Sequence, residues 1–512
     1  MIKQADKEDL TGKNRLVVNT LVSWTSHLVL IVSGFIMPRL VDGFVGQEQL
    51  GVWDFCWSFI SYLVLVGLGV GSDSNRFIAE ARSNQDYDRL NQVLSTVIAI
   101  QLVVSFVTFL GTLAVVFSFD IIFSDRLGDY LSESKGVMLF LGLSLVATNL
   151  FSSFRGVLTG YHRWDIHNGL TALTSLISLA GMLFALVNGF GIVGMACAYF
   201  IVSALLELLR LYLTCKYCEK LAPRWKLISF NTAKEVMGYG VKCKLASLAP
   251  VFLLQSINIL IVSALGPAML AVFSRSFALT KHISTFLSKF TMIITPSVSS
   301  MLNGNNSDEL RSFFILTTKL NFAFALPLVI FLVIFGDVVL TFWMGSNYAN
   351  ASLITILAIG ALLPIAQDPS LRILMGLNQH GKISFYLFLL VFVLYGLFYI
   401  YFQNTPLTLV SAALALTIPM NIAYGLLLPI SACQKIALSK LVYIKQAILP
   451  SFLAILPFIC LVIFARYLFN VEQYILSLLL LMFSGIVLLF VYANFILTKV
   501  QRNKFINKIH KR

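Results

Sequence analysis

A series of long apolar runs is the feature that most constrains what this chain can fold into. A helix that crosses the hydrocarbon core of a bilayer needs about 20 mostly apolar residues. Fourteen segments are of about that length, and no alternating strand pattern competes with them. They lie near residues 16–38, 50–71, 92–118, 136–154, 169–188, 191–214, 240–265, 269–298, 313–340, 351–371, 383–403, 407–432, 447–467 and 473–498. The sequence therefore predicts an all-α membrane protein with about 14 transmembrane helices.

The composition agrees with this fold class and excludes several others. The 512 residues are 58% hydrophobic and 12% charged. Soluble domains are about 45–50% apolar and about 25% charged, so this chain has too little charge for a cytosolic enzyme, a secreted disulfide scaffold or a disordered protein. The one close cysteine pair, Cys215 and Cys218, has no second pair or histidine nearby, so we expect no metal site.

The basic residues are unequally distributed between the two sides of the predicted membrane domain. With the N-terminus inside, 26 of the 37 Lys and Arg fall in inner segments, 3 in outer loops and 8 within spans. Basic loops are retained on the cytoplasmic side, so both termini are expected in the cytoplasm. The net charge of +14 then reflects topology and contact with anionic membrane lipids rather than a nucleic-acid partner.

The two halves of the chain repeat each other at an offset of 220 residues. VGQEQLGVWDF at 45–55 aligns with LGPAMLAVFSR at 265–275, and FRGVLTG at 154–160 echoes LRILMG at 371–376. The offset covers six helices, and an even number gives both halves the same orientation in the membrane. We therefore predict two six-helix lobes around a central cavity. The predicted parts are an N-lobe (1–214), a cytoplasmic linker (215–239), a C-lobe (240–432), helices 13 and 14 (433–498) and a basic cytoplasmic tail (499–512).

Residues 38–91 combine a Gly-x-x-x-Leu-Gly motif, a second helix that ends in glycines, and an Arg-Phe-x-Ala-Glu motif. The residues are Gly46, Leu50, Gly51, Gly67, Gly69, Gly71, Arg76, Phe77, Ala79 and Glu80. With its counterpart at 256–279, this segment resembles the bacterial O-antigen (Wzx-type) polysaccharide flippases of the multidrug/oligosaccharidyl-lipid/polysaccharide exporter superfamily. Leu50 stands where that family usually has an aromatic residue.

This resemblance implies a flippase in the bacterial inner (cytoplasmic) membrane. Its substrate would be an undecaprenyl-diphosphate-linked oligosaccharide, an O-antigen or capsule repeat unit, that moves from the cytoplasmic to the periplasmic leaflet by alternating access. Coupling to a proton or sodium gradient is implied for at least some members. We expect no cofactor, and we expect polysaccharide assembly proteins as partners.

Charges within the apolar runs are functional candidates, because each costs at least about 2.5–3.5 kcal/mol in the hydrocarbon core. Arg275, His282 and Lys289 recur every seven residues and so form one helical stripe about 21 Å long. We expect this stripe to face the cavity and to hold the lipid diphosphate in stages, with Arg275 binding phosphate bidentately. The predicted binding cations are Arg275, Lys281, His282, Lys289, Lys244 and Lys319. Alternatively, Lys289 and Lys319 only extend to the interface, and Arg275 pairs with an acid such as Asp54.

Other polar residues in the spans leave two interpretations open. Asp54 is a candidate for ion coupling or gating, or else a structural ion-pair partner. Asn19, Gln255 and Asn258 are candidates for binding sugar hydroxyls, or else for joining helices to each other. Asp368 and Arg372, four residues apart, predict a local helix pair.

Three other function classes remain as alternatives. A lipid II flippase of the same superfamily would carry the same diphosphate. A cation-coupled drug antiporter should present acids to its substrate, whereas the spans here hold more bases. A membrane polysaccharide polymerase or ligase needs catalytic residues on a large outer loop, and the outer loops are short, so no catalytic residue is predicted. GLNQHGKIS at 376–384 has Ile383 where a phosphate loop needs Ser or Thr, which disfavours ATP binding.

Overall fold

A computed structural model describes residues 13–67, 70, 74–292, 294–302, 307–470 and 473–496. Every regular element in these ranges is helical, and twelve helices are long and apolar enough to cross a membrane. The first two predicted spans form one helix kinked at Gly46, and the predicted eighth span is α11 (Pro267–Thr291), which is not among the twelve. The twelve helices become fourteen spans when α1 is counted as two and α11 is added. The predicted spans therefore correspond to helical segments, and the all-α membrane fold is confirmed.

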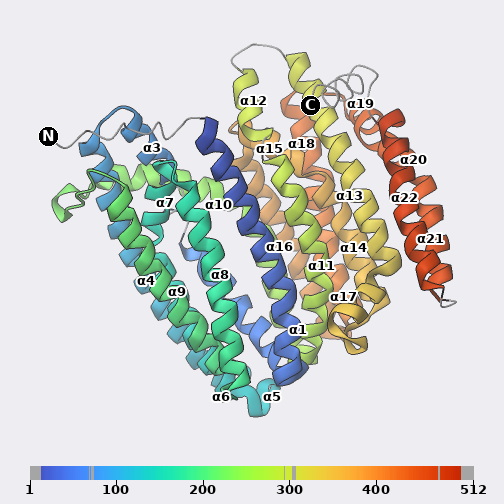
Figure 1. Ribbon diagram of the computed structural model, residues 1–512, viewed down its shortest axis with the longest axis horizontal. Helices are drawn as coiled ribbons and strands as arrows, with labels where there is room; N and C mark the ends of the chain where they lie inside the picture. Colours follow the sequence, from blue (N-terminus) through green and yellow to red (C-terminus); the bar gives the residue numbers. More distant parts are fainter. Residues whose placement is uncertain are drawn as a thin grey trace. The chain divides into compact units, whose positions relative to one another are not determined.

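The chain divides by its internal contacts into two compact units, residues 1–271 and 272–512. Helix α11 crosses this boundary. The first unit otherwise holds α1 (Lys13–Val66), α3 (Asn75–Ser83), α4 (Tyr87–Ile122), α5 (Ser124–Leu127), α6 (Leu131–Leu150), α7 (Ser152–Gly160), α8 (Trp164–Val187), α9 (Gly191–Tyr217) and α10 (Phe230–Leu265). Within it, α4 packs on α6, α6 on α9 and α9 on α8 (Figure 1).

The second unit contains the remaining α-helices of the described chain, besides two π-helices (Asn421–Leu427 and Ile444–Ile448) and a short 3-10 helix (Ser346–Tyr348). The α-helices are α12 (Ile294–Leu302), α13 (Ser307–Met344), α14 (Ala351–Ala366), α15 (Asp368–Gly376), α16 (His380–Asn404), α17 (Leu409–Met420), α18 (Leu428–Lys435), α19 (Lys440–Tyr443), α20 (Leu449–Ala454), α21 (Leu456–Asn470) and α22 (Tyr474–Phe495). By contacts α10 belongs with the first unit, although the predicted C-lobe begins at residue 240. The lobes and the central cavity stay predictions, and Gly69, Gly71 and the basic tail lie outside the described residues.

Helix α4 shows that the chain is built to face lipid. It buries Gln101, Thr108 and Thr112, while Phe106 and Phe117 are exposed. In water this distribution would be unfavourable, because apolar surface is normally removed from solvent. In a bilayer the exposed rings meet acyl chains. The buried hydroxyls donate to backbone carbonyls one turn earlier; the Thr112 hydroxyl, for example, donates to the carbonyl of Thr108 (2.8 Å).

The backbone confirms the internal repeat. Gly46 has φ +83° and ψ 174°, and Gly266, 220 residues later, has φ +87° and ψ 171°. This region of backbone space is accessible essentially only to glycine. Gly46 joins the two halves of α1, and Gly266 joins α10 to α11, so the same turn begins the second helix of each repeat.

A second pair of matching contacts extends the repeat to short helices. In the first unit α7 packs on α3, and a Cβ added to Gly160 would lie 2.8 Å from the Ile78 side chain. In the second unit α15 packs on α12, and a Cβ on Gly376 would lie 2.7 Å from Val298. Ile78 and Val298 are again 220 residues apart, so the weak echo between 154–160 and 371–376 reflects the same glycine-mediated helix contact.

We expect Gly46→Ala to lower the free energy of unfolding by about 1–3 kcal/mol, because alanine cannot adopt this φ and ψ without strain. The measurement is the midpoint of thermal unfolding of the purified protein in detergent. Gly43→Ala is the matched control, since Gly43 lies in the same helix and a Cβ there meets nothing within 4 Å. Equal midpoints for both variants would contradict the expected strain at Gly46.

Candidate functional site

The predicted basic stripe lies on α11, which is an unbroken helix from Pro267 to Thr291. Arg275 is buried, with 7% of its surface exposed, and His282 and Lys289 are half-buried. Lys281 is exposed. A different face of α11, at Ile283 and Leu287, packs into the apolar core of the second unit. The i, i+7, i+14 spacing therefore places the three cations on one side of α11, away from the direction of Ile283 and Leu287.

Lys244 and Lys319 are half-buried, on α10 and α13 respectively. Lys244 and Asp54 belong to the first unit, whereas Arg275 and Lys319 belong to the second. A common anion path along these cations, and the alternative pairing of Asp54 with Arg275, both stay predictions. Asp54 itself is half-buried, and its backbone carbonyl accepts a hydrogen bond from the Ser58 hydroxyl (3.1 Å).

Asn19 has well-defined protein partners that favour the helix-joining interpretation. Its Nδ2 donates to the carbonyl of His162 (3.3 Å), and its Oδ1 accepts from the backbone N–H of Asp165 (3.1 Å). One turn later, Asn168 Nδ2 donates to Ser23 Oγ (2.6 Å). These bonds tie α1 to the start of α8 and use both ends of the Asn19 amide, so sugar binding there would have to replace them.

Gln255 and Asn258 lie in a similar contact between α10 and α1. Asn258 Nδ2 donates to Ser58 Oγ (3.1 Å) and to Gln255 Oε1 (3.2 Å), and both amide side chains are buried. Close by, Tyr62 donates to the carbonyl of Phe252 (2.9 Å). These contacts also favour helix joining over direct contact with sugars.

The predicted local pair between Asp368 and Arg372 is confirmed. Arg372 Nε donates to Asp368 Oδ2 at 3.1 Å, four residues apart on α15. The Thr291 hydroxyl, at the end of α11, donates to the same carboxylate oxygen. The pair therefore also links the end of α11 to α15.

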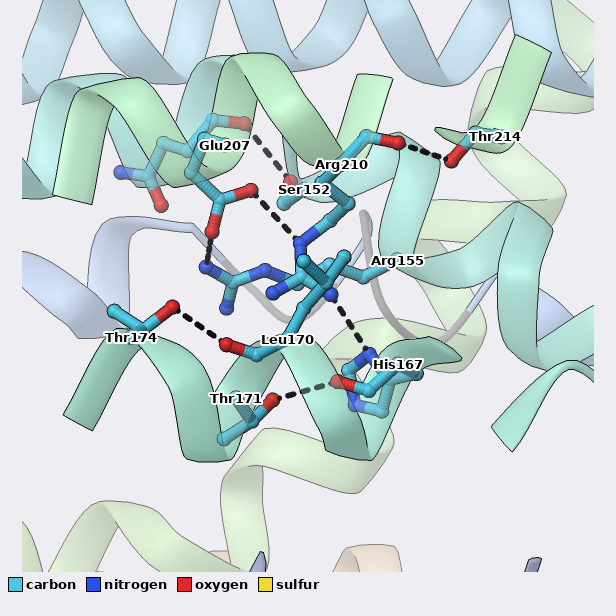
Figure 2. Close-up of polar contacts among 10 residues, drawn as sticks. Ser152, Arg155, His167, Leu170, Thr171, Thr174, Glu207, Arg210 and Thr214 are labelled. Carbon is cyan, nitrogen blue, oxygen red and sulfur yellow. Dashed lines mark hydrogen bonds and ion pairs between the residues drawn. The ribbon is translucent and has the colours of Figure 1, made fainter. Parts of the chain in front are cut away.

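A buried charge network that the pattern of apolar runs alone does not show joins α7, α8 and α9 (Figure 2). Glu207 and Arg210 are 4% and 3% exposed. One carboxylate oxygen of Glu207 accepts from Arg155 Nη2, and the other accepts from Arg210 Nε at 3.1 Å. Arg210 Nη1 lies 3.1 Å from His167 Nδ1, and because guanidinium only donates, this ring nitrogen is the acceptor.

This network has a net positive charge inside the membrane domain, since one carboxylate faces two guanidiniums. Arg155 Nε is buried without a hydrogen-bond partner within the described residues. The sequence signal that could have found the network is Glu207 and Arg210, three residues apart within the apolar run 191–214. Such i, i+3 charges on one helix face, deep in a span, predict mutual pairing and a partner from a neighbouring helix.

Comparison with known proteins gives one family and one fold. The family model described as "Polysaccharide biosynthesis protein" matches residues 77–353, more than half of the chain. No curated protein is a significant sequence match.

Solved transporters share the fold across most of the chain. An inward-facing multidrug resistance MATE family transporter of the MOP superfamily has a TM-score of 0.68 and 17% identity, covering 82% of this chain and 98% of its own. An outward-facing multidrug resistance MATE family transporter has a TM-score of 0.60, 17% identity and coverages of 84% and 97%. A MOP superfamily transporter from Pyrococcus furiosus, described as having a binding pocket of reverse polarity that suggests a different function, has a TM-score of 0.62, 16% identity and coverages of 82% and 95%.

Proposed function

The chain belongs to the polysaccharide biosynthesis protein family and has the fold of MOP superfamily transporters, and from that premise we propose that it is a lipid-linked oligosaccharide flippase. Its substrate is an undecaprenyl-diphosphate-linked oligosaccharide, an O-antigen or capsule repeat unit. The protein moves it from the cytoplasmic to the periplasmic leaflet by alternating access. The observation that carries this proposal is the buried Arg275 on a helix that also bears His282 and Lys289.

The physical argument rests on charge. A cation in a membrane helix is costly unless an anion or a polar cavity compensates for it. A diphosphate supplies that anion, and a planar guanidinium can donate two parallel hydrogen bonds to it. Three cations spaced along one helix can pass the headgroup from one to the next, so that no single site traps it.

The polarity of the spans disfavours a drug antiporter, because a cationic drug calls for carboxylates. The Pyrococcus transporter described as having a pocket of reverse polarity is a precedent for a different function on this fold. A lipid II flippase would bind the same diphosphate chemistry, so the charge argument does not separate it from the proposed function. Rescue of cell-wall synthesis after depletion of the resident lipid II flippase would favour that alternative.

Membrane placement and energy supply complete the proposal. The excess of basic residues in the predicted inner segments supports a multi-pass protein of the bacterial inner membrane with both termini in the cytoplasm. Transport is coupled to a proton or sodium gradient, for which Asp54 is the candidate carboxylate. The protein works beside polysaccharide assembly proteins, which supply and use the lipid-linked repeat.

Reconstitution into vesicles tests the proposal directly. Fluorescent undecaprenyl-diphosphate oligosaccharide is placed in both leaflets, and an impermeant reducing agent reports how much of it is reachable from outside. We expect the labelled lipid of the inner leaflet, which the reducing agent cannot reach, to move to the outer leaflet at least about tenfold faster than in empty vesicles. Exchange at the rate of empty vesicles, by protein that is folded and inserted, would contradict the proposed function.

A further inference from the structure

The segment between α9 and α10, with the helix ends that flank it (residues 216–230), is an ordered surface feature and not only a linker. Helix α9 ends at Tyr217, α10 begins at Phe230, and a single 3-10 turn covers Trp225–Leu227. We call residues 216–230 the interfacial loop.

Side chains near the start of α4 hold the backbone of the interfacial loop. Asn91 Oδ1 accepts from the N–H of Ala222 (2.7 Å), and Asn91 Nδ2 donates to the carbonyl of Lys220 (3.1 Å). Ser95 Oγ accepts from the N–H of Arg224 (3.0 Å). These polar groups of the loop backbone are satisfied by protein, so the bonds fix the conformation of the irregular segment against α4.

The inner side of the interfacial loop is apolar and packed. Cys218 is buried, and Leu221 packs against the same apolar cluster. Burial raises the pKa of the Cys218 thiol to about 12, so the side chain stays neutral. Lys220 has a left-handed backbone (φ +60°), and its ammonium lies 4.0 Å from the centre of the Tyr87 ring.

The outer side of the interfacial loop exposes large apolar side chains. Trp225 is 70% exposed and Phe230 is 83% exposed, with Ile228 between them also exposed. Exposing three such side chains together to water is unfavourable, at roughly 25 cal/mol per Å² of apolar surface. Aromatic side chains are enriched where a membrane meets water, because the ring reaches the headgroup region there.

Basic side chains surround these aromatics. Residues 216–234 contain five basic residues and one acid, Glu219, and all six are exposed. The basic residues are Lys216, Lys220, Arg224, Lys226 and Lys234. The next acid, Glu235, pairs with Arg89 of α4 at 2.5 Å, so it does not neutralise the loop. The exposed surface is therefore both apolar and strongly cationic.

We propose that the interfacial loop binds acidic phospholipid headgroups at the membrane surface, with Trp225 and Phe230 inserted between them and Arg224 and Lys226 on their phosphates. The position of the loop supports a lipid rather than a protein as its occupant. It begins where the span Gly191–Tyr217 ends, and it packs on the first turns of the span Tyr87–Ile122. Basic residues beside a span attract anionic lipids, and rings beside them anchor the segment.

The test measures quenching of Trp225 by lipids with brominated acyl chains. Full-length wild type and Trp225→Phe are titrated in detergent with brominated phosphatidylglycerol or phosphatidylcholine, and the difference between the two proteins isolates Trp225 from the other five tryptophans. We expect half-maximal quenching at an about tenfold lower concentration of phosphatidylglycerol than of phosphatidylcholine. Equal concentrations for the two lipids would overturn the proposal.

Charge variants identify the residues responsible. Arg224→Ser with Lys226→Ser should abolish the preference for phosphatidylglycerol, whereas Lys435→Ser with Lys440→Ser, which removes two exposed cations elsewhere, should retain it. If the first pair does not fold, Lys226→Ser alone should reduce the preference about threefold. Two outcomes would contradict a lipid site. In the first, soluble glycerol phosphate fully prevents quenching by the brominated lipids. In the second, an acidic peptide changes the fluorescence of Trp225, but neither brominated lipid quenches it. None of these outcomes depends on the transported substrate, so they test the interfacial loop separately from the flippase proposal.

Discussion

Arg275→Ala is expected to abolish glycan export while the protein remains folded and inserted in the membrane. Each charge-assisted hydrogen bond contributes about 1.5–3 kcal/mol, so losing a bidentate contact lowers the rate of flipping at least about tenfold. Two measurements check this: the polymer exported by cells that carry the variant, and the exchange rate of labelled lipid-linked oligosaccharide in vesicles. Arg275→Lys keeps the charge without the planar fork and should give an intermediate rate.

Two further variants separate substrate binding from structure. Lys382→Ala removes one exposed cation from the start of α16 and should leave export unchanged. The double variant Arg275→Ala with Asp54→Ala should stay inactive if Arg275 binds the diphosphate. Recovery of export in the double variant would instead mean that Arg275 serves as an ion-pair partner of Asp54. Normal export by Arg275→Ala alone would discard the role of the basic stripe.

Glu207→Gln should cause the largest loss of stability. The carboxylate pairs with the guanidiniums of both Arg155 and Arg210, and without its charge the buried Arg210 and the partly exposed Arg155 lose their shared counter-charge. Removing one partner of a buried ion pair costs about 3–5 kcal/mol, because the remaining charge is uncompensated. The measurements are the thermal unfolding midpoint in detergent and the yield of monodisperse protein.

Asp308→Asn is the matched control for Glu207→Gln. It makes the same change from carboxylate to amide beside an arginine, but the pair of Asp308 with Arg311 (2.9 Å) is exposed. Exposed pairs contribute about 0–1 kcal/mol, so the midpoint should hardly change. Replacing the three charged members of the network with apolar residues (Arg155→Met, Glu207→Leu and Arg210→Leu) should restore much of the stability. Similar midpoints for Glu207→Gln and Asp308→Asn would contradict the argument.

The helices and the repeat could be predicted because both depend on local sequence. A bilayer demands about 20 apolar residues per span, so the runs specify the helices. Gly46 and Gly266 could be matched from sequence alone, because only glycine tolerates the backbone that both adopt.

The partners of polar side chains could not be predicted in the same way. Asn19 and Asn258 were equally suited to sugars or to neighbouring helices, and the structure gives both of them partners on adjacent helices. Glu207 and Arg210 lay within a predicted span, yet their third partner, Arg155, comes from a helix some 50 residues earlier. Residues 215–239 were predicted as a linker, because composition does not show that Asn91 and Ser95 fix that segment.

By itself, the sequence determined that this is a helical membrane protein with an internal repeat and cations in its spans, because the hydrocarbon core imposes rules on each segment independently. Only the tertiary structure decided which polar groups pair: Glu207 with two arginines, Asn19 with α8, and the interfacial loop with α4. Those choices depend on which faces of distant helices meet. A hydrogen bond within about 3 Å is decided by packing geometry that no single segment contains.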